Sequence, residues 1–226
     1  MARSAEMGVE LGLGAAAALV ALLDRLSLEQ QNLTAIEGLE EGIDRHLADS
    51  LAALALPAVA GAGAAVDIGS GAGFPGLALA LARPGLAVTL VESEERKADW
   101  LRRASEPLSN VRVVADRSEH LAARERERWP LATARALGPL PVVLELAAPL
   151  VAPGGTLVVW RGDAAPPAER AGAARAAAEL GLVPGPETAV RPFAGARRHL
   201  LEFRKVRSTP PRFPRRAGRA AKRPLA

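Results

Sequence analysis

The chain of 226 residues contains no cysteine and no tyrosine. Without cysteine there can be no disulfide, no zinc–thiolate site, no iron–sulfur cluster and no cysteine nucleophile. A dehydrogenase on this chain would have neither tyrosine nor cysteine as a proton donor. The three histidines, at positions 46, 120 and 199, are far apart and show no metal-ligand spacing, so we predict no metal site.

Long hydrophobic runs are also missing. The run from Leu11 to Leu23 is too short to cross a bilayer and contains two glycines. The run from Leu51 to Val66 is broken by Pro57 and two further glycines. No signal-peptide pattern precedes these runs. We therefore predict a cytoplasmic protein without a membrane partner.

Acidic residues are scarce at one end of the chain only. Residues 1–56 carry nine acidic and three basic side chains, and residues 57–196 carry fifteen of each. Residues 197–226 carry eleven basic side chains against one acid, Glu202. The net charge of +4 therefore conceals a strongly basic tail on an acidic or neutral body. A tail of this kind suggests a polyanionic partner.

The apolar pattern is typical of an α/β protein with a parallel sheet. Short runs without alternation occupy residues 64–68, 87–91, 111–114, 131–134 and 156–160. Helical patterns occupy residues 15–26, 40–56, 77–83, 93–105, 140–150 and 168–180. Buried strands separated by helices predict a doubly wound, mostly parallel sheet covered on both faces. Two last strand patterns, at 188–193 and 199–205 with Gly195 between them, predict an antiparallel C-terminal hairpin.

The end of the chain is rich in proline and arginine. Pro210, Pro211 and Pro214 follow Arg204 closely. Proline lacks a backbone N–H and disfavours helix in the residue before it. We therefore predict that the segment from Arg204 is extended and forms no helix.

The strongest local signal is the loop DIGSGAGFPG at residues 67–76, directly after the first predicted strand. In a doubly wound fold this turn lies at the carboxyl edge of the sheet, where ligands bind. Glycines allow the backbone to approach a ligand closely. Glu92 ends the second predicted strand, at the spacing where an acid commonly binds a ribose diol. The alternative is that the loop is only a tight turn between strand and helix and binds no ligand. The acid at position 92 favours a nucleotide site.

Two cofactors compete for this loop. Gly71, Gly73 and Gly76 satisfy the GxGxxG pattern of dinucleotide-binding proteins, although Pro75 interrupts it. Starting two residues earlier, Asp67 is followed by a GxGxG pattern that resembles the S-adenosylmethionine site of class I methyltransferases. The loop favours the second cofactor without excluding NAD.

Beyond the loop, the chain resembles the bacterial small-subunit ribosomal RNA guanine-N7 methyltransferases of the glucose-inhibited division protein B type. The resemblance runs from about Asn32 to Leu225. It rests on an ordered set of motifs: NLTAI at 32–36, RHLADSL at 45–51, DIGSGAGFPG at 67–76, DRSE at 116–119, ARAL at 134–137 and RKVRSTPPRFPRRAG at 204–218. The resemblance implies a Rossmann-like class I methyltransferase that uses S-adenosyl-L-methionine and methylates a guanine of 16S ribosomal RNA.

The expected cofactor-binding residues fall at the ends of four predicted strands. They are Gly69, Gly71, Gly73, Phe74, Glu92, Ser118, Glu119 and Arg135. The resemblance implies that Gly69 and Phe74 contact the cofactor. It also implies that Ser118 and Glu119 lie beside the adenine, and that Arg135 closes the site from the fourth strand.

Guanine N7 carries a lone pair and no proton, so its methylation needs no general base. Alignment of the nucleophile, methyl carbon and sulfur is then the main task. The sequence offers no convincing acid–base pair, and we predict no catalytic acid or base. His46, Asp49 and Ser50 are interpreted as a packing and hydrogen-bond cluster, with a role near the substrate as the alternative. Candidates to hold phosphate or guanine are Arg117, Arg135, Arg161 and Arg198. Trp160 is interpreted as a core residue, with stacking on a base as the alternative.

We divide the chain into an N-terminal helical extension (1–56), a methyltransferase domain (57–206) and a basic tail (207–226), and expect a monomer. The competing hypotheses are an NAD-dependent oxidoreductase on a Rossmann sheet and a non-catalytic RNA-binding factor. The tail is expected to pack partly on the body and to contact the RNA backbone of the partner. That partner is expected to be 16S ribosomal RNA or the small ribosomal subunit. Such contacts would make RNA affinity fall steeply with salt. From sequence, removing residues 208–226 is expected to weaken RNA binding more than cofactor binding.

Overall fold

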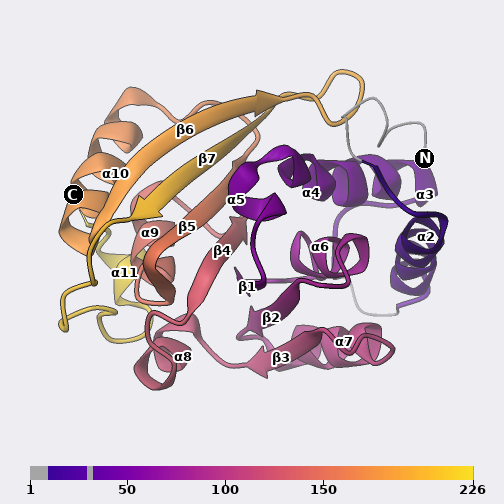
Figure 1. The fold of residues 1–226 in the computed structure, drawn as a ribbon, viewed down its shortest axis with the longest axis horizontal. Coiled ribbons are helices and arrows are strands. Elements are labelled where there is room, and N and C mark those ends of the chain that lie inside the picture. The colour runs from indigo at the N-terminus through magenta and orange to yellow at the C-terminus, as the bar shows by residue number, and fades with distance from the viewer. Residues whose placement is uncertain (1–9, 30–32, 226) are drawn as a thin grey trace.

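A seven-stranded sheet runs through the middle of the molecule in the order β3-β2-β1-β4-β5-β7-β6 (Figure 1). The computed structural model describes residues 10–29 and 33–225. The strands are β1 (Ala64–Ile68), β2 (Ala87–Glu92), β3 (Val111–Ala115), β4 (Trp129–Arg135), β5 (Val151–Arg161), β6 (Leu182–Val190) and β7 (Arg198–Lys205). The first five are parallel, and β7 pairs antiparallel with both β5 and β6. The predicted doubly wound sheet with an antiparallel C-terminal hairpin is confirmed.

Helices cover both faces of this sheet. Before β1 lie α2 (Leu13–Ser27), α3 (Leu39–Gly42), the π-helical turn η1 (Ile43–Ala48), α4 (Asp49–Leu51), the 3₁₀ turn η2 (Ala52–Ala55) and α5 (Pro57–Ala60). Within the sheet region lie α6 (Gly76–Ala82), α7 (Glu95–Ser105), α8 (Ser118–Arg124), α9 (Leu140–Ala147) and α10 (Pro167–Leu180), and α11 (Arg219–Lys222) lies in the tail.

The core consists of two apolar layers separated by the sheet. In β1, Ala65 packs in the layer that contains Leu19 of α2 and Leu77 of α6. Its neighbour Val66 packs in the other layer, with Leu144 of α9. Successive strand residues point to opposite faces, which places them in different layers. Both faces of β1 are buried, as its short run without polar–apolar alternation predicts.

Several elements differ from the sequence expectation. The single helix predicted over 40–56 is divided by η1 and η2, and π-helical turns are frequent at functional sites. Helix α8 was not predicted, because its seven residues show little periodicity. Strand β6 begins at Leu182, not near residue 188, and runs through Pro184. It can do so because β6 is the edge strand of the sheet, where a missing N–H breaks no ladder.

The C-terminal segment departs from the expected extended chain at α11, which forms beyond the last of the clustered prolines. The prediction that no helix forms after Arg204 was therefore wrong for residues 219–222. The segment also packs on the body. Lys205 is buried and donates from Nζ to the Ala148 carbonyl at 2.5 Å, and Glu127 lies 3.2 Å away. Burial lowers the pKa of Lys205 to about 8, although the Glu127 carboxylate opposes this shift.

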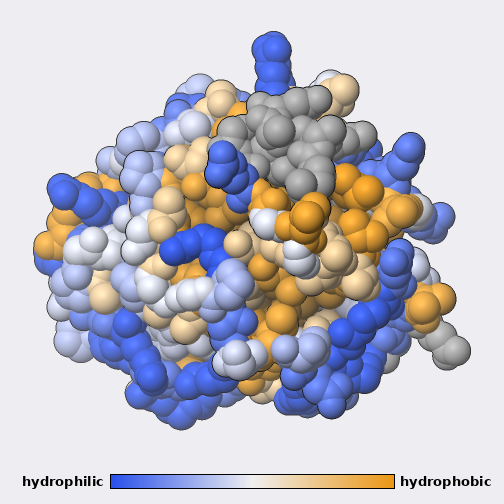
Figure 2. Space-filling model, turned by 45° about the vertical axis from the view of Figure 1, so that its right-hand side comes forward, coloured by the Kyte–Doolittle hydropathy of each residue, from blue (hydrophilic) through white to orange (hydrophobic). Residues whose placement is uncertain are grey.

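The N-terminal helices form one flank of the molecule. Part of the predicted 1–56 extension, residues 1–9 and 30–32, lies outside the described residues, and this includes Asn32 of the NLTAI motif. Figure 2 brings this flank forward and shows apolar surface gathered in its middle, framed by hydrophilic side chains. Among residues 10–29 and 33–225, no helix is long and apolar enough to cross a membrane.

Candidate functional site

The glycine loop sits at the carboxyl end of β1 and is tied to β2. The N–H groups of Gly69 and Ser70 both donate to the Val91 carbonyl, at 2.9 and 3.1 Å. Gly69 has a φ of +68°, and a Cβ there would lie 2.5 Å from Leu137 Cδ1. The backbone conformation therefore favours glycine at this position, and any side chain there would require Leu137 to move.

Backbone hydrogen bonds orient the carboxylate of Glu92. Gly71 N–H donates to its Oε2 at 3.0 Å, and Glu94 N–H donates to its Oε1 at 2.8 Å. Two backbone bonds fix the orientation of the carboxylate while leaving further lone pairs on both oxygens. The side chain lines a cavity, so it is oriented to accept hydrogen bonds from a diol.

Asp67 does not line this cavity but braces the loop from inside. Thr133 Oγ1 donates to its Oδ1 at 2.7 Å, and Gly76 N–H donates to its Oδ2 at 3.2 Å. Burial raises the pKa of this carboxyl, and the hydrogen bonds from Thr133 and Gly76 oppose the rise. The acid that begins the motif therefore fixes the two ends of the loop to each other and to β4.

The loop opens onto a cavity of about 790 Å³ at the carboxyl edge of the sheet. Five of the predicted cofactor residues line it: Gly69, Gly71, Phe74, Glu92 and Arg135. Thr34, His46 and Asp49 of the N-terminal segment complete the wall, with Arg161 and Arg198 from the far strands. The cavity therefore lies where nucleotides bind in doubly wound folds, between the sheet edge and the N-terminal helices.

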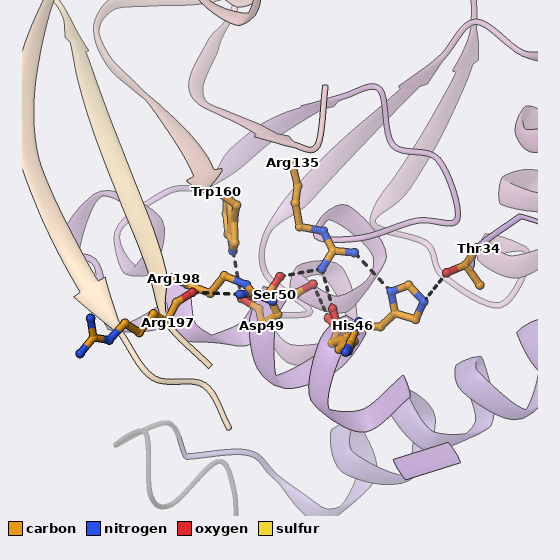
Figure 3. A network of polar contacts seen from close by, with 9 residues as sticks. Thr34, His46, Asp49, Ser50, Arg135, Trp160, Arg197 and Arg198 are labelled. Carbon is orange, nitrogen blue, oxygen red and sulfur yellow. Dashed lines mark hydrogen bonds and ion pairs between the residues drawn. The ribbon is translucent and has the colours of Figure 1, made fainter. Parts of the chain in front are cut away.

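A network around Asp49 joins these walls (Figure 3). Arg135 Nη1 donates to Asp49 Oδ2 at 2.8 Å, and Arg198 Nε donates to Oδ1 at 2.8 Å. Trp160 Nε1 donates to the Asp49 carbonyl at 2.9 Å. Asp49 is buried and thus bridges the ends of β4, β5 and β7 to α4. Trp160 itself is buried, as predicted.

His46 is packed against the glycine loop. Its ring stacks on Phe74 with centroids 4.3 Å apart and planes 14° apart. Arg135 Nη2 faces its Nδ1 at 3.3 Å, and Thr34 Oγ1 lies 3.0 Å from its Nε2. Because a guanidinium can only donate, Nδ1 is the acceptor and Nε2 carries the proton. Burial, with a smaller contribution from the Arg135 charge, lowers the pKa of His46 to about 4.

This environment predicts a pH-dependent stability. The pKa of His46 is lower in the folded chain than its ordinary value of 6.5, so the unfolded chain binds the proton more readily. The free energy of unfolding is therefore highest above about pH 6.5 and falls as the pH drops toward 4, by roughly 3 kcal/mol at most.

Urea unfolding of wild type and His46→Phe at pH 7 and pH 5 measures this loss of stability. The wild type should lose more stability than the variant. His120→Gln, at an imidazole more than half exposed, is the control, and equal losses in wild type and His46→Phe would contradict the assignment.

The remaining predicted residues lie elsewhere. Ser118 and Glu119 line a second, smaller cavity of about 130 Å³ beside the first, and Gly69 lines both. Gly73 lines neither, and a Cβ there would lie 2.4 Å from Leu77 Cδ1. It is the part of the loop that packs against Leu77 and Leu101, and its contact with a cofactor stays a prediction. Arg117 lines the second cavity.

Sequence reasoning missed several members of the site. Thr34 was not singled out, nor was the stacking of His46 on Phe74. The four positions 34, 46, 135 and 198 are joined only by the packing of the N-terminal segment on the sheet edge, which no local pattern encodes. Among residues 10–29 and 33–225, no group of three or more His, Asp or Glu side chains could hold a metal ion.

The chain is similar in sequence to a known protein family. The family described as rRNA small subunit methyltransferase G (GidB) matches residues 15–184. A protein of Deinococcus deserti named ribosomal RNA small subunit methyltransferase G is 40% identical, over 96% of this chain and 92% of its own. The protein of the same name from Chloroflexus aggregans is 42% identical, over 90% of this chain and 87% of its own.

Solved structures show the same fold at low sequence identity. A 16S rRNA (adenine(1408)-N(1))-methyltransferase from Catenulisporales acidiphilia, solved with cosubstrate SAM, has a TM-score of 0.53 at 20% identity. It covers 67% of this chain and 89% of its own. The 1,6-didemethyltoxoflavin-N1-methyltransferase of Burkholderia thailandensis has a TM-score of 0.52 at 18% identity, over 88% of this chain and 93% of its own.

Proposed function

The chain belongs to the family of small-subunit ribosomal RNA methyltransferases G, so it is an S-adenosylmethionine-dependent rRNA methyltransferase, and we propose that its methyl acceptor is N7 of a guanine in 16S ribosomal RNA. The observation that supports the proposal is the larger of the two cavities, onto which the glycine loop opens. There the glycine loop, Glu92 and Arg135 meet at the carboxyl edge of the sheet, beside cationic side chains.

The residues of the cavity fit S-adenosylmethionine. Glu92 offers an oriented carboxylate to a ribose diol, and the Gly69–Gly71 backbone leaves space that side chains would fill. The bound cofactor supplies a methyl group already activated by its positive sulfur. We propose that Gly69, Gly71, Phe74, Glu92 and Arg135 hold it, with Ser118 and Glu119 at its adenine end.

The main task of the protein is then to align guanine N7 with the methyl group of the cofactor. Guanine N7 has no proton to lose, so no side chain of the site must act as a base before attack. His46 fits this requirement, because both of its ring nitrogens are engaged, with Arg135 and Thr34. We propose that its ring supports Phe74 and Arg135, so that the target base is held in line with the methyl donor. The base must leave its stack to reach the cavity, which favours an unpaired or flipped guanine.

The basic C-terminal segment supports an RNA partner. We propose that the substrate is 16S rRNA alone or within the small ribosomal subunit, that the enzyme is a monomer, and that it acts in the cytoplasm away from membranes. Exposed cations of this segment, among them Arg204, Arg216 and Lys222, are available for phosphate contacts.

Labelled-methyl transfer tests this proposal. Small subunits and naked 16S RNA are prepared from a strain lacking the protein and incubated with the enzyme and methyl-labelled S-adenosylmethionine. We expect label in the RNA, mapping to N7 of a guanine. Label on another atom would refute the assigned acceptor. Absence of transfer, together with NAD binding and no S-adenosylhomocysteine binding by calorimetry, would favour the oxidoreductase alternative. RNA binding without either cofactor would favour a non-catalytic factor.

A further inference from the structure

The second cavity is closed by a part of the chain far from the glycine loop. It lies over the carboxyl end of β3, with Ser118 and Glu119 on its floor. Its outer wall includes Gly218, Ala220 and Ala221 of the C-terminal segment. In Figure 1, α11 lies near α8 and α9, at the same end of the sheet. The basic tail therefore contributes backbone and small side chains to a cavity, in addition to charges on the surface.

A hydrogen bond joins this wall to the floor. Gly218 N–H donates to Glu119 Oε1 at 2.9 Å. Glu119 is buried, so this contact is shielded from water. Gly218 has a φ of +77°, a conformation that suits glycine and turns the chain into α11. The position of α11 thus depends on Glu119.

Further contacts fasten the segment on both sides of the hydrogen bond. Arg215 Nε donates to Glu145 Oε1 at 2.7 Å, and the Glu145 carboxylate is almost fully buried in α9. Arg126 Nη1 donates to the Phe213 carbonyl at 2.6 Å. Phe213 is itself in the core, so the segment is docked by packing as well as by charge. These contacts hold α11 in place over the cavity.

The second cavity adjoins the first. The two share Gly69, Ser93 and Leu137. Its walls include apolar side chains, Ile68, Val91 and Leu146, and its polar side chains are Ser93, Asp116, Arg117, Ser118 and Glu119. Apolar walls with a few polar groups suit a flat heterocycle that has donors and acceptors at its edge.

The sheet order gives the direction of the ligand. Glu92, proposed to hold the ribose, ends β2, and β3 is the next strand outward. The reactive end must face Arg135 at the end of β4, on the opposite side of β1. The base of the nucleoside then points toward β3. We propose that residues 218–221 of the tail form the outer wall of the adenine subsite, so that the C-terminal segment binds the cofactor as well as RNA. This proposal rests on the proposed function.

The test compares cofactor and RNA affinity in tail variants. In one, Ala220→Leu, a larger side chain enters the wall of the cavity. In the other, the chain ends after Arg216. Calorimetry measures binding of S-adenosylhomocysteine and of adenosine, which would occupy the adenine and ribose subsites without the amino-acid part of the cofactor site. Both variants should bind both ligands about tenfold more weakly or worse. Ala220→Leu should keep its affinity for 16S RNA, because it changes no charge.

Lys222→Ala is the matched control. It removes an exposed charge from the same short helix, so it should keep the affinity for S-adenosylhomocysteine and lose some affinity for RNA. Unchanged adenosine and S-adenosylhomocysteine affinity in Ala220→Leu would overturn the proposal, and so would a truncated chain that loses RNA affinity alone. Failure of the unaltered chain to bind S-adenosylhomocysteine would instead count against the proposed function.

Discussion

Gly69→Arg should lower kcat/KM for methyl transfer by roughly a thousandfold or more while the chain still folds. The substituted side chain would start at a point that lines both cavities. It would fill the space between Glu92 and Phe74, where we place the cofactor. It would also add a positive charge next to a positively charged sulfur. Loss of cofactor binding is therefore the main expected effect.

The cost to the fold is small by comparison. A side chain at a φ of +68° costs about 1–2 kcal/mol. The clashing neighbour is Leu137 Cδ1, the end of a side chain that can change its rotamer. Gly154→Arg is the matched control, because Gly154 has a φ of +85° and none of the described residues lies within 4 Å of its Cβ position. It lies at the start of β5, at the edge of the sheet opposite the site.

Two measurements decide the outcome. Thermal unfolding should give similar losses of stability for the two arginine variants. Methyl transfer to 16S RNA should be lost in Gly69→Arg and kept in Gly154→Arg. Retained activity in Gly69→Arg would mean that the loop does not hold the cofactor. Equal loss of activity in the two variants would mean that backbone strain alone is responsible.

The sheet was predictable because buried parallel strands leave a simple signal. Each of the five apolar runs became a strand, and Glu92 fell at the end of β2 as the spacing required. The failures are elements stabilised by tertiary contacts. Strand β6 passes through Pro184 because it is an edge strand. Helix α11 has four residues and is placed by the contacts of Gly218 and Arg215 with distant side chains.

The candidate site was predictable where its residues lie at strand ends. The glycine loop follows β1, and Glu92 and Arg135 end β2 and β4, so position along the sequence was enough to find them. Asp49 was interpreted as part of a local cluster with His46 and Ser50. The structure adds two guanidinium groups to it, from positions 86 and 149 residues away along the chain. Contacts at that separation depend on the packing of the N-terminal helices, which the sequence pattern does not encode.

The Asp49 network carries the second large prediction. Asp49→Ala should destabilise the fold by about 3–5 kcal/mol, because it removes the only carboxylate between Arg135 and Arg198 in the network of Figure 3. The Asp49 side chain is 5% exposed, and that of Arg135 is 16% exposed. Removing the anion leaves two poorly hydrated cations facing each other. For a chain of this length the midpoint of thermal unfolding should fall by roughly 10 °C.

A surface pair provides the comparison. Asp99 pairs with Arg102 on α7, and both side chains are about half exposed. Asp99→Ala should therefore cost less than about 1 kcal/mol. If Asp49→Ala costs no more than this, the network contributes nothing beyond a surface ion pair.

A double-mutant cycle separates repulsion from lost packing. Adding Arg198→Ala to Asp49→Ala removes one of the two stranded cations. If repulsion between guanidinium groups dominates, the double variant should be more stable than the sum of the single losses predicts, by more than about 1 kcal/mol. Simple additivity would mean that Asp49 and Arg198 contribute independently, and would exclude repulsion between the guanidinium groups as the cause. Methyl transfer should recover little in the double variant, because Arg135 would still lack the carboxylate that aims it at the cavity.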